Sequence, residues 1–388
     1  MNRAENSPDR PLDVWFVCNA WTGGGAERVA STIVQHLDRD IVQPSVCLLR
    51  NDMSYPLPED VEVHHLDYRG LPTFFSTARR LRRLVNDRRP DVVVSTVNAN
   101  ALLTGAALKR STHSPPWIAR IGSSPRHHDR GLRGISARSL YRNADRFIAN
   151  SERLTSDVAS IYPFTSGRVS TIRNACDFEV IDHLAKSPTD LRPPDGPLLA
   201  AVGRLVAVKR YDMMLEALAI VRRNIPASLW VCGEGPARKD LERQTGRLRL
   251  GDAVRWMGFT DNPYAVIRSA DLYVLTSDYE GSPNSLIEAQ SLGLAAVSTR
   301  CDYGPDEIIS DGVSGLLTPP GNANEFAKAV VALLSDGKKR AAYGLRAKEA
   351  VRHKFALKPI IDKWHAVLQA LSGSETRSGT PDGNSGMG

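Results

Sequence analysis

Ser187-Pro-Thr-Asp-Leu-Arg-Pro-Pro-Asp-Gly-Pro197 is followed at once by the apolar run Leu198-Leu-Ala-Ala-Val202. Four prolines and a glycine disfavour both helix and sheet, so residues 187–197 are interpreted as a linker between domains. The apolar run is typical of a buried strand and restarts an alternation of strands and helices. A chain of 388 residues is also too long for one ordinary domain, so two domains are expected.

Short apolar runs alternate with helical patterns on both sides of this linker. Such alternation is typical of βαβ units, so two Rossmann-like α/β domains in tandem, facing an interdomain cleft, are expected. Residues 12–186 form the first domain and 198–355 the second; a helix over 356–371 and a disordered tail over 372–388 follow. The expected strands are 14–18, 44–49, 91–96, 117–121, 146–149, 198–202, 229–232, 272–276 and 295–298, and the expected helices include 26–37 and 75–87.

The composition is that of an ordinary globular protein, with 42% hydrophobic and 24% charged residues. No apolar run is long enough to cross a bilayer, and the polar residues 1–10 lack the apolar stretch of a secretory signal, so the protein is expected in the cytosol. The five cysteines show no metal-ligand spacing, which favours buried, reduced thiols and no metal site.

The net charge of +7 is unevenly distributed along the chain. Residues 1–68 carry a net charge of −6, whereas residues 69–153 carry +12. A basic block of this size indicates an anionic partner near the first domain.

Thr22-Gly-Gly-Gly-Ala-Glu-Arg28 lies between the first expected strand and its helix. Gly24 and Gly25 let backbone amides approach a ligand at a helix N-terminus, a place that favours anions. The spacing fits neither a dinucleotide fingerprint nor a Walker loop, so a purely structural turn is an equally open interpretation.

Two cations follow the first strand of the second domain. Gly203 and Arg204 come directly after it, and Lys209 comes five residues later. Arginine can hold a diphosphate through two parallel hydrogen bonds, and lysine acts as a point charge. The alternative is a pair of solvated surface cations.

Two further turns close strands of the second domain. They are Gly233-Glu-Gly235-Pro236 and Met257-Gly258-Phe259-Thr260. Both fall beyond the carboxyl ends of parallel strands, where open sheets bind ligands, so they are candidates for a nucleobase pocket. Ordinary turns are the alternative.

The segment 278–288, Asp-Tyr-Glu-Gly-Ser-Pro-Asn-Ser-Leu-Ile-Glu, contains the start of a helix. Ser282 is a good N-cap and Pro283 a good first helical residue. The backbone amides near Asn284 and Ser285 are then expected to point into the cleft and bind phosphate.

Two acids flank this helix start. Glu280 precedes the helix, where it can face a transferred sugar. Glu288 lies six residues past the expected cap, ~9 Å along the axis, where a ribose would fit. A capped helix with two surface acids is the alternative interpretation.

Glu280 and Glu288, with seven residues between them, resemble the E-x7-E motif of family-4 retaining glycosyltransferases, which have the GT-B fold. The similarity covers residues 13–370, and its motifs are specific together although each is weak alone. The other matches are Gly24-Gly-Ala-Glu-Arg28, Ala149-Asn-Ser151-Glu, Arg173-Asn174-Ala-Cys-Asp177, Gly203-Arg204 with Lys209, Gly233-Glu-Gly235, and Gly304-Pro-Asp-Glu307-Ile-Ile-Ser-Asp-Gly312.

The resemblance implies a nucleotide-diphosphate sugar held mainly by the second domain. Glu280 would meet the donor sugar, Glu288 the ribose, and Arg204 and Lys209 the diphosphate. The first domain would supply the acceptor site, with Asn174 on that side, and the last helix would cross back to it. No cofactor and no metal are implied, because cations and helix amides meet the phosphate charge.

One feature departs from the family pattern. Many relatives carry a histidine just after the strand that here reads Trp117-Ile-Ala-Arg-Ile121, but this chain has Gly122-Ser-Ser124 there. His127 and His128 follow a few residues later. Either one of them enters the cleft on the acceptor side, or both lie on a solvated basic loop.

The expected function is retaining transfer of a sugar to an acceptor hydroxyl, with a UDP-sugar favoured over a GDP-sugar, in surface polysaccharide or glycolipid assembly. In a front-face displacement the leaving diphosphate, neutralised by Arg204 and Lys209, takes the acceptor proton while Glu280 stabilises positive charge; double displacement through Glu280 is a variant. A nucleotide-sugar 2-epimerase and a non-catalytic nucleotide-sugar-binding protein remain as alternatives.

The basic block also contains a cationic helix behind an aromatic pair, Phe74 and Phe75. The resembled family often takes glycan or lipid-linked acceptors at the cytoplasmic leaflet, so a peripheral position on an anionic membrane is expected, with a solvated helix as the alternative. No nucleic-acid-binding module is present, so no nucleic-acid partner is expected. The helix cations are Arg79, Arg80, Arg82 and Arg83.

Overall fold

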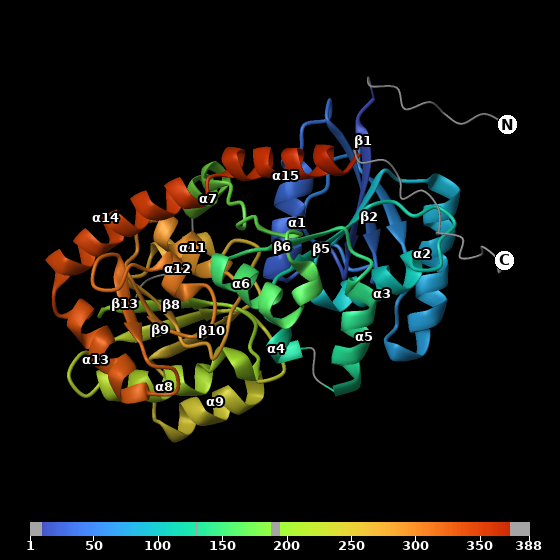
Figure 1. Cartoon of the computed structure of the whole chain (residues 1–388). Coiled ribbons are helices and arrows are strands. Elements are labelled where there is room, and N and C mark those ends of the chain that lie inside the picture. The colour runs from blue at the N-terminus through green and yellow to red at the C-terminus, as the bar shows by residue number, and fades with distance from the viewer. Residues whose placement is uncertain (1–9, 129–130, 188–194, 373–388) are drawn as a thin grey trace, which may run out of the picture.

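The computed structural model describes residues 10–128, 131–187 and 195–372. These residues form two lobes, each built on a parallel sheet with helices packed against it (Figure 1). The expectation of two Rossmann-like α/β domains is confirmed. Most of the expected linker and almost all of the expected tail lie outside the described residues.

The first sheet has seven strands in the order β3-β2-β1-β4-β5-β6-β7. Strand β1 lies inside this sheet and pairs on both sides, as at Val14, which lies between Pro44 and Val92. Helices cover both faces of such a sheet, which explains the continuous apolar runs of its inner strands. The strands are β1 (Leu12–Cys18), β2 (Val42–Leu48), β3 (Glu62–His65), β4 (Val92–Ser95), β5 (Trp117–Ile121), β6 (Arg146–Ala149) and β7 (Val169–Thr171).

Two helical layers enclose the first sheet. One layer contributes Leu81, Leu103 and Tyr141 to the core, and the other contributes Val34 and Trp364. The first layer comprises α2 (Phe74–Arg88), α3 (Asn98–Leu108), α5 (Gly131–Tyr141) and α6 (Glu152–Ile161), and the second comprises α1 (Gly25–His36) and α15 (Leu357–Ser372). Short helical segments are η1 (Leu71–Thr73), α4 (Pro125–His128) and η2 (Pro163–Thr165).

The second sheet has six strands in the order β10-β9-β8-β11-β12-β13. Helices α8, α9 and α13 pack on one face, and α7, α10 and α11 pack on the other. The strands are β8 (Leu198–Val202), β9 (Ser228–Cys232), β10 (Val254–Gly258), β11 (Leu272–Leu275), β12 (Ala296–Thr299) and β13 (Gly315–Thr318). The helices are α7 (Phe178–Ala185), η3 (Ala207–Lys209), α8 (Tyr211–Val221), α9 (Arg238–Arg247), α10 (Tyr264–Arg268), α11 (Asn284–Ser291), α12 (Pro305–Ile308), α13 (Ala323–Leu334) and α14 (Gly337–Lys354).

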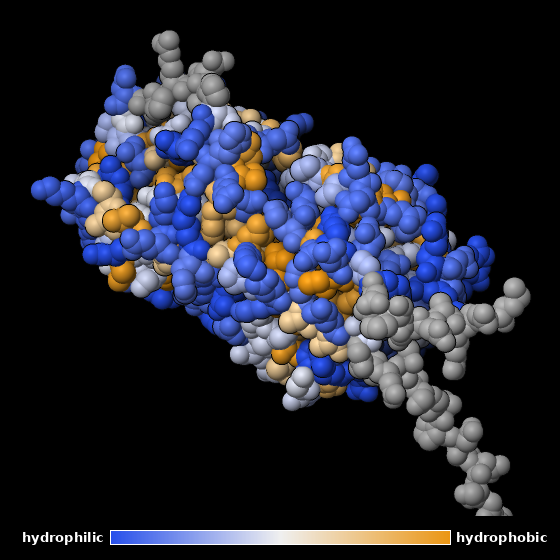
Figure 2. Space-filling view, turned by 90° about the horizontal axis from the view of Figure 1, so that it is seen from above, coloured by the Kyte–Doolittle hydropathy of each residue, from blue (hydrophilic) through white to orange (hydrophobic). Residues whose placement is uncertain are grey.

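The chain passes between the two lobes at two neighbouring points. Cys176 pairs with Ala356, and the amide of Cys176 donates to the carbonyl of Phe355 at 3.2 Å. Past the first point, α7 packs on the second domain although it precedes residue 186; past the second, α15 returns to the first sheet. Seen from the side of α15, apolar side chains gather along the middle of the face among hydrophilic ones (Figure 2). The two crossings therefore run together where the lobes meet.

The structure agrees with the expected strands wherever the apolar run is continuous. Strands β5, β6 and β8 have the expected bounds. Strands β3, β7 and β13 were not expected; they are edge strands of three or four residues. Pairing with a neighbouring strand defines such an element more than its own hydrophobicity does.

Candidate active site between the domains

A cleft of about 890 Å³ lies between the two domains. Its walls are loops that follow the carboxyl ends of β1, β5 and β6 in the first sheet and of β8, β9 and β11 in the second. The strand order reverses next to β1 and β8, and open parallel sheets bind ligands at such points. Residues that the sequence singled out line this cleft, namely Gly24, Gly25, Asn174, Gly203, Arg204, Lys209, Phe259, Glu280, Ser282, Pro283, Asn284, Ser285 and Glu288.

The glycine turn after β1 forms one end of the cleft. A Cβ atom added to Gly24 would lie 1.9 Å from a carboxylate oxygen of Glu27, so the acid can fold over this position only because a glycine is there. Burial raises the pKa of Glu27, and the opposing charge of Arg204 limits the rise. The turn therefore brings the backbone of Gly24 and Gly25 and the carboxyl group of Glu27 to the cleft.

On the opposite wall, Lys209 and Glu280 form an ion pair. Helix η3 brings Lys209 Nζ to 2.5 Å from Glu280 Oε1, and Ser277 Oγ donates to the same oxygen at 2.6 Å. The amide of Glu280 donates to the carbonyl of Asp302 at 3.0 Å, which fixes the backbone. Arg204 is exposed and lines the same cleft. Two cations and one acid thus face a common space.

Helix α11 begins one residue later than expected. Ser282 was expected as N-cap and Pro283 as the first helical residue, but the structure has Pro283 as N-cap and Asn284 as the first residue. Pro283 has ψ 103°, outside the helical region, and the carbonyl of Ser282 accepts a hydrogen bond from Asn174 at 3.2 Å. Contact with the first domain therefore decides where the helix starts. Asn284 and Ser285 still line the cleft.

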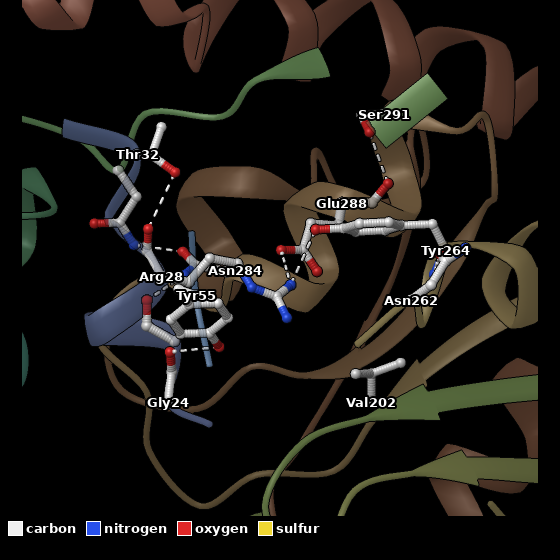
Figure 3. A network of polar contacts seen from close by, with 12 residues as sticks. Gly24, Arg28, Thr32, Tyr55, Val202, Asn262, Tyr264, Asn284, Glu288 and Ser291 are labelled. Carbon is white, nitrogen blue, oxygen red and sulfur yellow. Dashed lines mark hydrogen bonds and ion pairs between the residues drawn. The ribbon is translucent and has the colours of Figure 1, made fainter. Parts of the chain in front are cut away.

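Glu288 is held by an arginine from the other domain. Arg28 Nη1 donates to Glu288 Oε1 at 2.9 Å and to the Tyr264 hydroxyl at 3.0 Å (Figure 3). The Glu288 carboxylate raises the pKa of Arg28 above its ordinary value. Nearby, Asn284 Nδ2 donates to the carbonyl of Gly25 at 2.8 Å. The position expected for a ribose is therefore built from both domains.

The first domain contributes a buried cation, Arg120, at the end of β5. Its guanidinium donates to the carbonyl of Thr96 at 3.1 Å and to Oδ1 of Asn174 at 2.7 Å. Burial lowers the pKa of Arg120 to about 10. Asn174 Nδ2 in turn donates to Asn284 Oδ1 at 2.6 Å. Asn174, expected on the acceptor side, thus connects Arg120 to the start of α11.

Four expected site residues, all within the described chain, lie outside the cleft lining. Gly235 packs behind it, since an added Cβ would lie 2.4 Å from the carbonyl of Leu205. Met257 packs in a small apolar cluster, and Gly258 has φ 75°, which suits a turn. The ring of His127 stacks on that of Tyr279, with centroids 3.9 Å apart.

Of the two histidines, His127 therefore contacts the second domain at the residue before Glu280. It neither enters the cleft nor lies on a solvated loop. His128 ends helix α4, and its side chain lies outside what the structure describes.

Several cleft residues were not assigned from the sequence. Glu27 and Arg28 belong to the quoted glycine motif, and a signal for Arg120 was available, because an arginine inside an otherwise apolar strand needs a polar partner. Gly281 approaches the first domain so closely that an added Cβ would lie 1.8 Å from the carbonyl of Gly122. Such a contact between domains leaves no periodic pattern in the sequence.

The rim of the interface is closed by charged groups. Glu307 accepts hydrogen bonds from the amides of Glu152 and Arg153, at 3.1 and 3.0 Å, and so caps the N-terminus of α6 from the other domain. Arg153 also pairs with Asp306 at 2.5 Å. The Tyr303 hydroxyl donates to Asp157 at 2.7 Å. These contacts hold the two cleft walls in a defined relation.

Two features of the described residues bear on metals and membranes. No group of three or more His, Cys, Asp or Glu side chains within residues 10–128, 131–187 and 195–372 is arranged to hold a metal ion. A helix long and apolar enough to span a bilayer is absent from the same residues.

Two family models match adjoining parts of the chain. The model for Glycosyltransferase Family 4 matches residues 23–180, and the model for Glycosyl transferases group 1 matches residues 185–350. One model matches the first domain and the other the second, so each wall of the cleft lies in the part of the chain that one model matches.

Full-length relatives and solved structures agree with these matches. A lipopolysaccharide core biosynthesis glycosyltransferase, LpsE of Rhizobium meliloti, is 25% identical over 90% of this chain and 96% of its own length. An N-acetylgalactosaminyltransferase of Campylobacter jejuni that acts on a diphospho-undecaprenol-linked sugar is 25% identical over 84% and 91%. The structure of Anabaena HepE in complex with UDP shares the fold, with a TM-score of 0.76, 19% identity and coverage of 92% and 100%. The chain therefore belongs to the family-4 glycosyltransferases of the GT-B fold.

Proposed function

We propose that this enzyme transfers a sugar from a nucleotide-diphosphate donor to an acceptor hydroxyl with retention of anomeric configuration. The observation that carries the proposal is the cluster of Arg204, Lys209 and Glu280 beside the N-terminus of α11, in one cleft. Two cations and the first amides of the helix match a diphosphate, and the acid lies next to one of those cations.

The mechanism proposed is a front-face displacement. The Lys209 ammonium carries three hydrogen atoms, so it can keep its contact with Glu280 while it donates to a donor phosphate. Glu280, held by Ser277 and Lys209, would stabilise the positive charge that develops on the sugar. An oxygen of the leaving diphosphate takes the acceptor proton. Arg204 neutralises part of the negative charge that develops on this diphosphate.

A UDP-sugar is the preferred donor. The Anabaena structure with this fold is a complex with UDP, and a second structure of the same protein contains UDP-glucose. Relatives named for lipopolysaccharide core biosynthesis and for a diphospho-undecaprenol-linked acceptor support a glycan or lipid-linked acceptor for this chain.

The test is incubation of the protein with UDP- and GDP-sugars, with and without an undecaprenyl-diphospho-sugar or a lipopolysaccharide core acceptor. Acceptor-dependent release of UDP, with the anomeric configuration kept in the product, is the expected result. Inversion of the anomer would refute retention. An isomerised nucleotide sugar formed without acceptor would identify an epimerase instead.

We also propose that the first domain binds an anionic membrane surface through the cationic helix α2. Helix α2 exposes Arg79 and Arg83, while Arg80 is paired with Asp67. Leu71 and Phe75 beside them are 83% and 82% exposed. Exposed apolar side chains among cations suit a headgroup region better than bulk water.

A further inference from the structure

Arg28 is the centre of the polar network between the domains (Figure 3). It lies in the first turn of α1, directly after the glycine motif, and its guanidinium carbon is 5.7 Å from the ring centroids of both Tyr55 and Tyr264. Tyr55 belongs to the first domain and Tyr264 to the second. The guanidinium is therefore held between two aromatic rings, one from each domain, with its Nη1 directed at Glu288.

Glu288 depends on this contact. The residue is only 3% exposed, and a buried carboxylate without a cation carries a large desolvation penalty. Its ion pair comes from the opposite domain at 2.9 Å. Because Arg28 donates to Oε1, the second oxygen, Oε2, would be the one that accepts a hydrogen bond from a ligand hydroxyl.

The same side chains separate two cavities. A second hollow of about 230 Å³ shares five lining residues with the main cleft, namely Arg28, Ser54, Tyr55, Asn284 and Glu288. These residues form the wall between the two spaces. Without Arg28 this wall would be incomplete, and the Glu288 carboxylate, which lines both spaces, could turn away from the cleft.

We propose that Arg28 is a positioning residue for the ribose end of the donor: it orients Glu288 from the other domain, so recognition of the ribose hydroxyls requires both domains. The inference rests on the proposed function, because it takes Glu288 as the group that meets the ribose hydroxyls. Arg28 itself acts through Glu288 and not on the reacting atoms. Other contacts, such as that between Asn284 and Gly25, keep the domains together when Arg28 is replaced.

The test measures binding of UDP, 2′-deoxy-UDP and 3′-deoxy-UDP by calorimetry, with GDP titrated in parallel. In the wild-type protein, loss of the hydroxyl that meets Glu288 should weaken binding about tenfold, the effect of one charged hydrogen bond. In Arg28→Met the ratio of the Kd for that deoxy-UDP to the Kd for UDP should fall below about threefold, because Glu288 is no longer held. Arg28→Lys, which keeps the charge but lacks the planar fork, should give an intermediate ratio.

Arg153→Met is the matched control. Arg153 also bridges the domains, pairs with an acid at 2.5 Å and stacks on a tyrosine ring, but it lies at the rim and outside the cleft lining of the described residues. It should lower thermal stability as Arg28→Met does and leave the deoxy-UDP ratios unchanged. Unchanged ratios in Arg28→Met, with UDP still bound, would overturn this inference alone. Failure of the wild-type protein to bind UDP or GDP would overturn the proposed donor class, and this inference with it.

Discussion

Lys209 Nζ lies 2.5 Å from Glu280 Oε1, across a cleft wall formed by the turns after β8 and β11. The residue expected to hold the diphosphate and the residue expected to meet the sugar are therefore in direct contact. The Glu280 side chain is 9% exposed, so the ammonium compensates a charge that has little access to water. Removal of the Lys209 ammonium should consequently change the behaviour of Glu280.

Glu280→Gln should lower kcat by at least ~10²-fold and leave the Kd for the donor within about threefold, because the carboxylate acts mainly on charge that develops in the transition state. Steady-state kinetics and calorimetry measure the two effects. Asp278→Asn is the control: it lies two residues away, is 42% exposed and pairs with Arg210, so kcat should stay near the wild-type value. Wild-type turnover in Glu280→Gln would remove this acid from the mechanism.

Arg204→Ala and Lys209→Ala should each weaken binding of UDP by ~1.5–3 kcal/mol, the effect of losing a charged hydrogen bond. Lys209→Ala should also lower kcat, since Glu280 loses its cation, whereas Arg204→Ala should act mainly on binding. Arg210→Ala serves as control, because that side chain faces Asp212 and Asp278. Wild-type UDP affinity in both Arg204→Ala and Lys209→Ala, as expected for the Arg210→Ala control, would contradict the role of both cations.

Activity should persist in excess EDTA. We expect Arg204, Lys209 and the amides at the start of α11 to balance the diphosphate charge without a metal ion. The measurement is the initial rate before and after chelation, with Mg²⁺ or Mn²⁺ added back. Loss of the rate on chelation and its return with either ion would show that a metal takes part.

Binding to liposomes should require anionic lipid and decrease with salt, because each basic residue near the surface contributes ~1 kcal/mol. Co-sedimentation with phosphatidylglycerol vesicles should fall strongly when Arg79, Arg80, Arg82 and Arg83 are replaced by Ser, with UDP affinity unchanged. The matched control removes four cations of α14 instead, Lys338, Lys339, Arg346 and Lys348. Wild-type protein that stays in the supernatant at low salt would refute a membrane-surface position.

Asp13 should make stability fall as pH rises. Burial, and then the neighbouring Asp91, raise the pKa of Asp13 to about 6, compared with about 3.9 in an unfolded chain. The native state therefore binds more protons between these values, and its free energy of unfolding decreases by about 1–2 kcal/mol as pH rises from 4 to 6. Asp13→Asn should remove this decrease, as measured by urea unfolding at pH 4, 5, 6 and 7. The exposed Glu59→Gln should keep the wild-type slope, and an equal slope in Asp13→Asn would contradict the assignment.

The glycine motif shows how far local sequence information extends. Its position between a strand and a helix predicts a turn near a ligand, and the structure has Gly24 and Gly25 in the cleft. The partner of Arg28, in contrast, lies 260 residues away in the sequence. No local pattern relates Arg28 to Glu288, because only the docking of the two domains brings them together.

Helix α11 illustrates the limit of capping rules. Ser282 and Pro283 favour a helix that starts at Pro283, and an isolated segment with that sequence would be expected to start there. In the protein, the Asn174 side chain donates a hydrogen bond to the carbonyl of Ser282, and the helix begins at Asn284. A tertiary hydrogen bond therefore overrides the local preference by one residue.

The sequence by itself determined the two α/β domains, the long apolar strands and the family, because hydrophobic periodicity and short motifs are encoded within a few neighbouring residues. Only the tertiary structure decided that Lys209 contacts Glu280, that Arg28 reaches Glu288, that His127 stacks on Tyr279 and that α7 joins the second domain. These contacts depend on the relative orientation of two sheets and on the paired crossings at Cys176 and Ala356. Their physical origin is the packing of surfaces that are far apart in the chain, which no local spacing records.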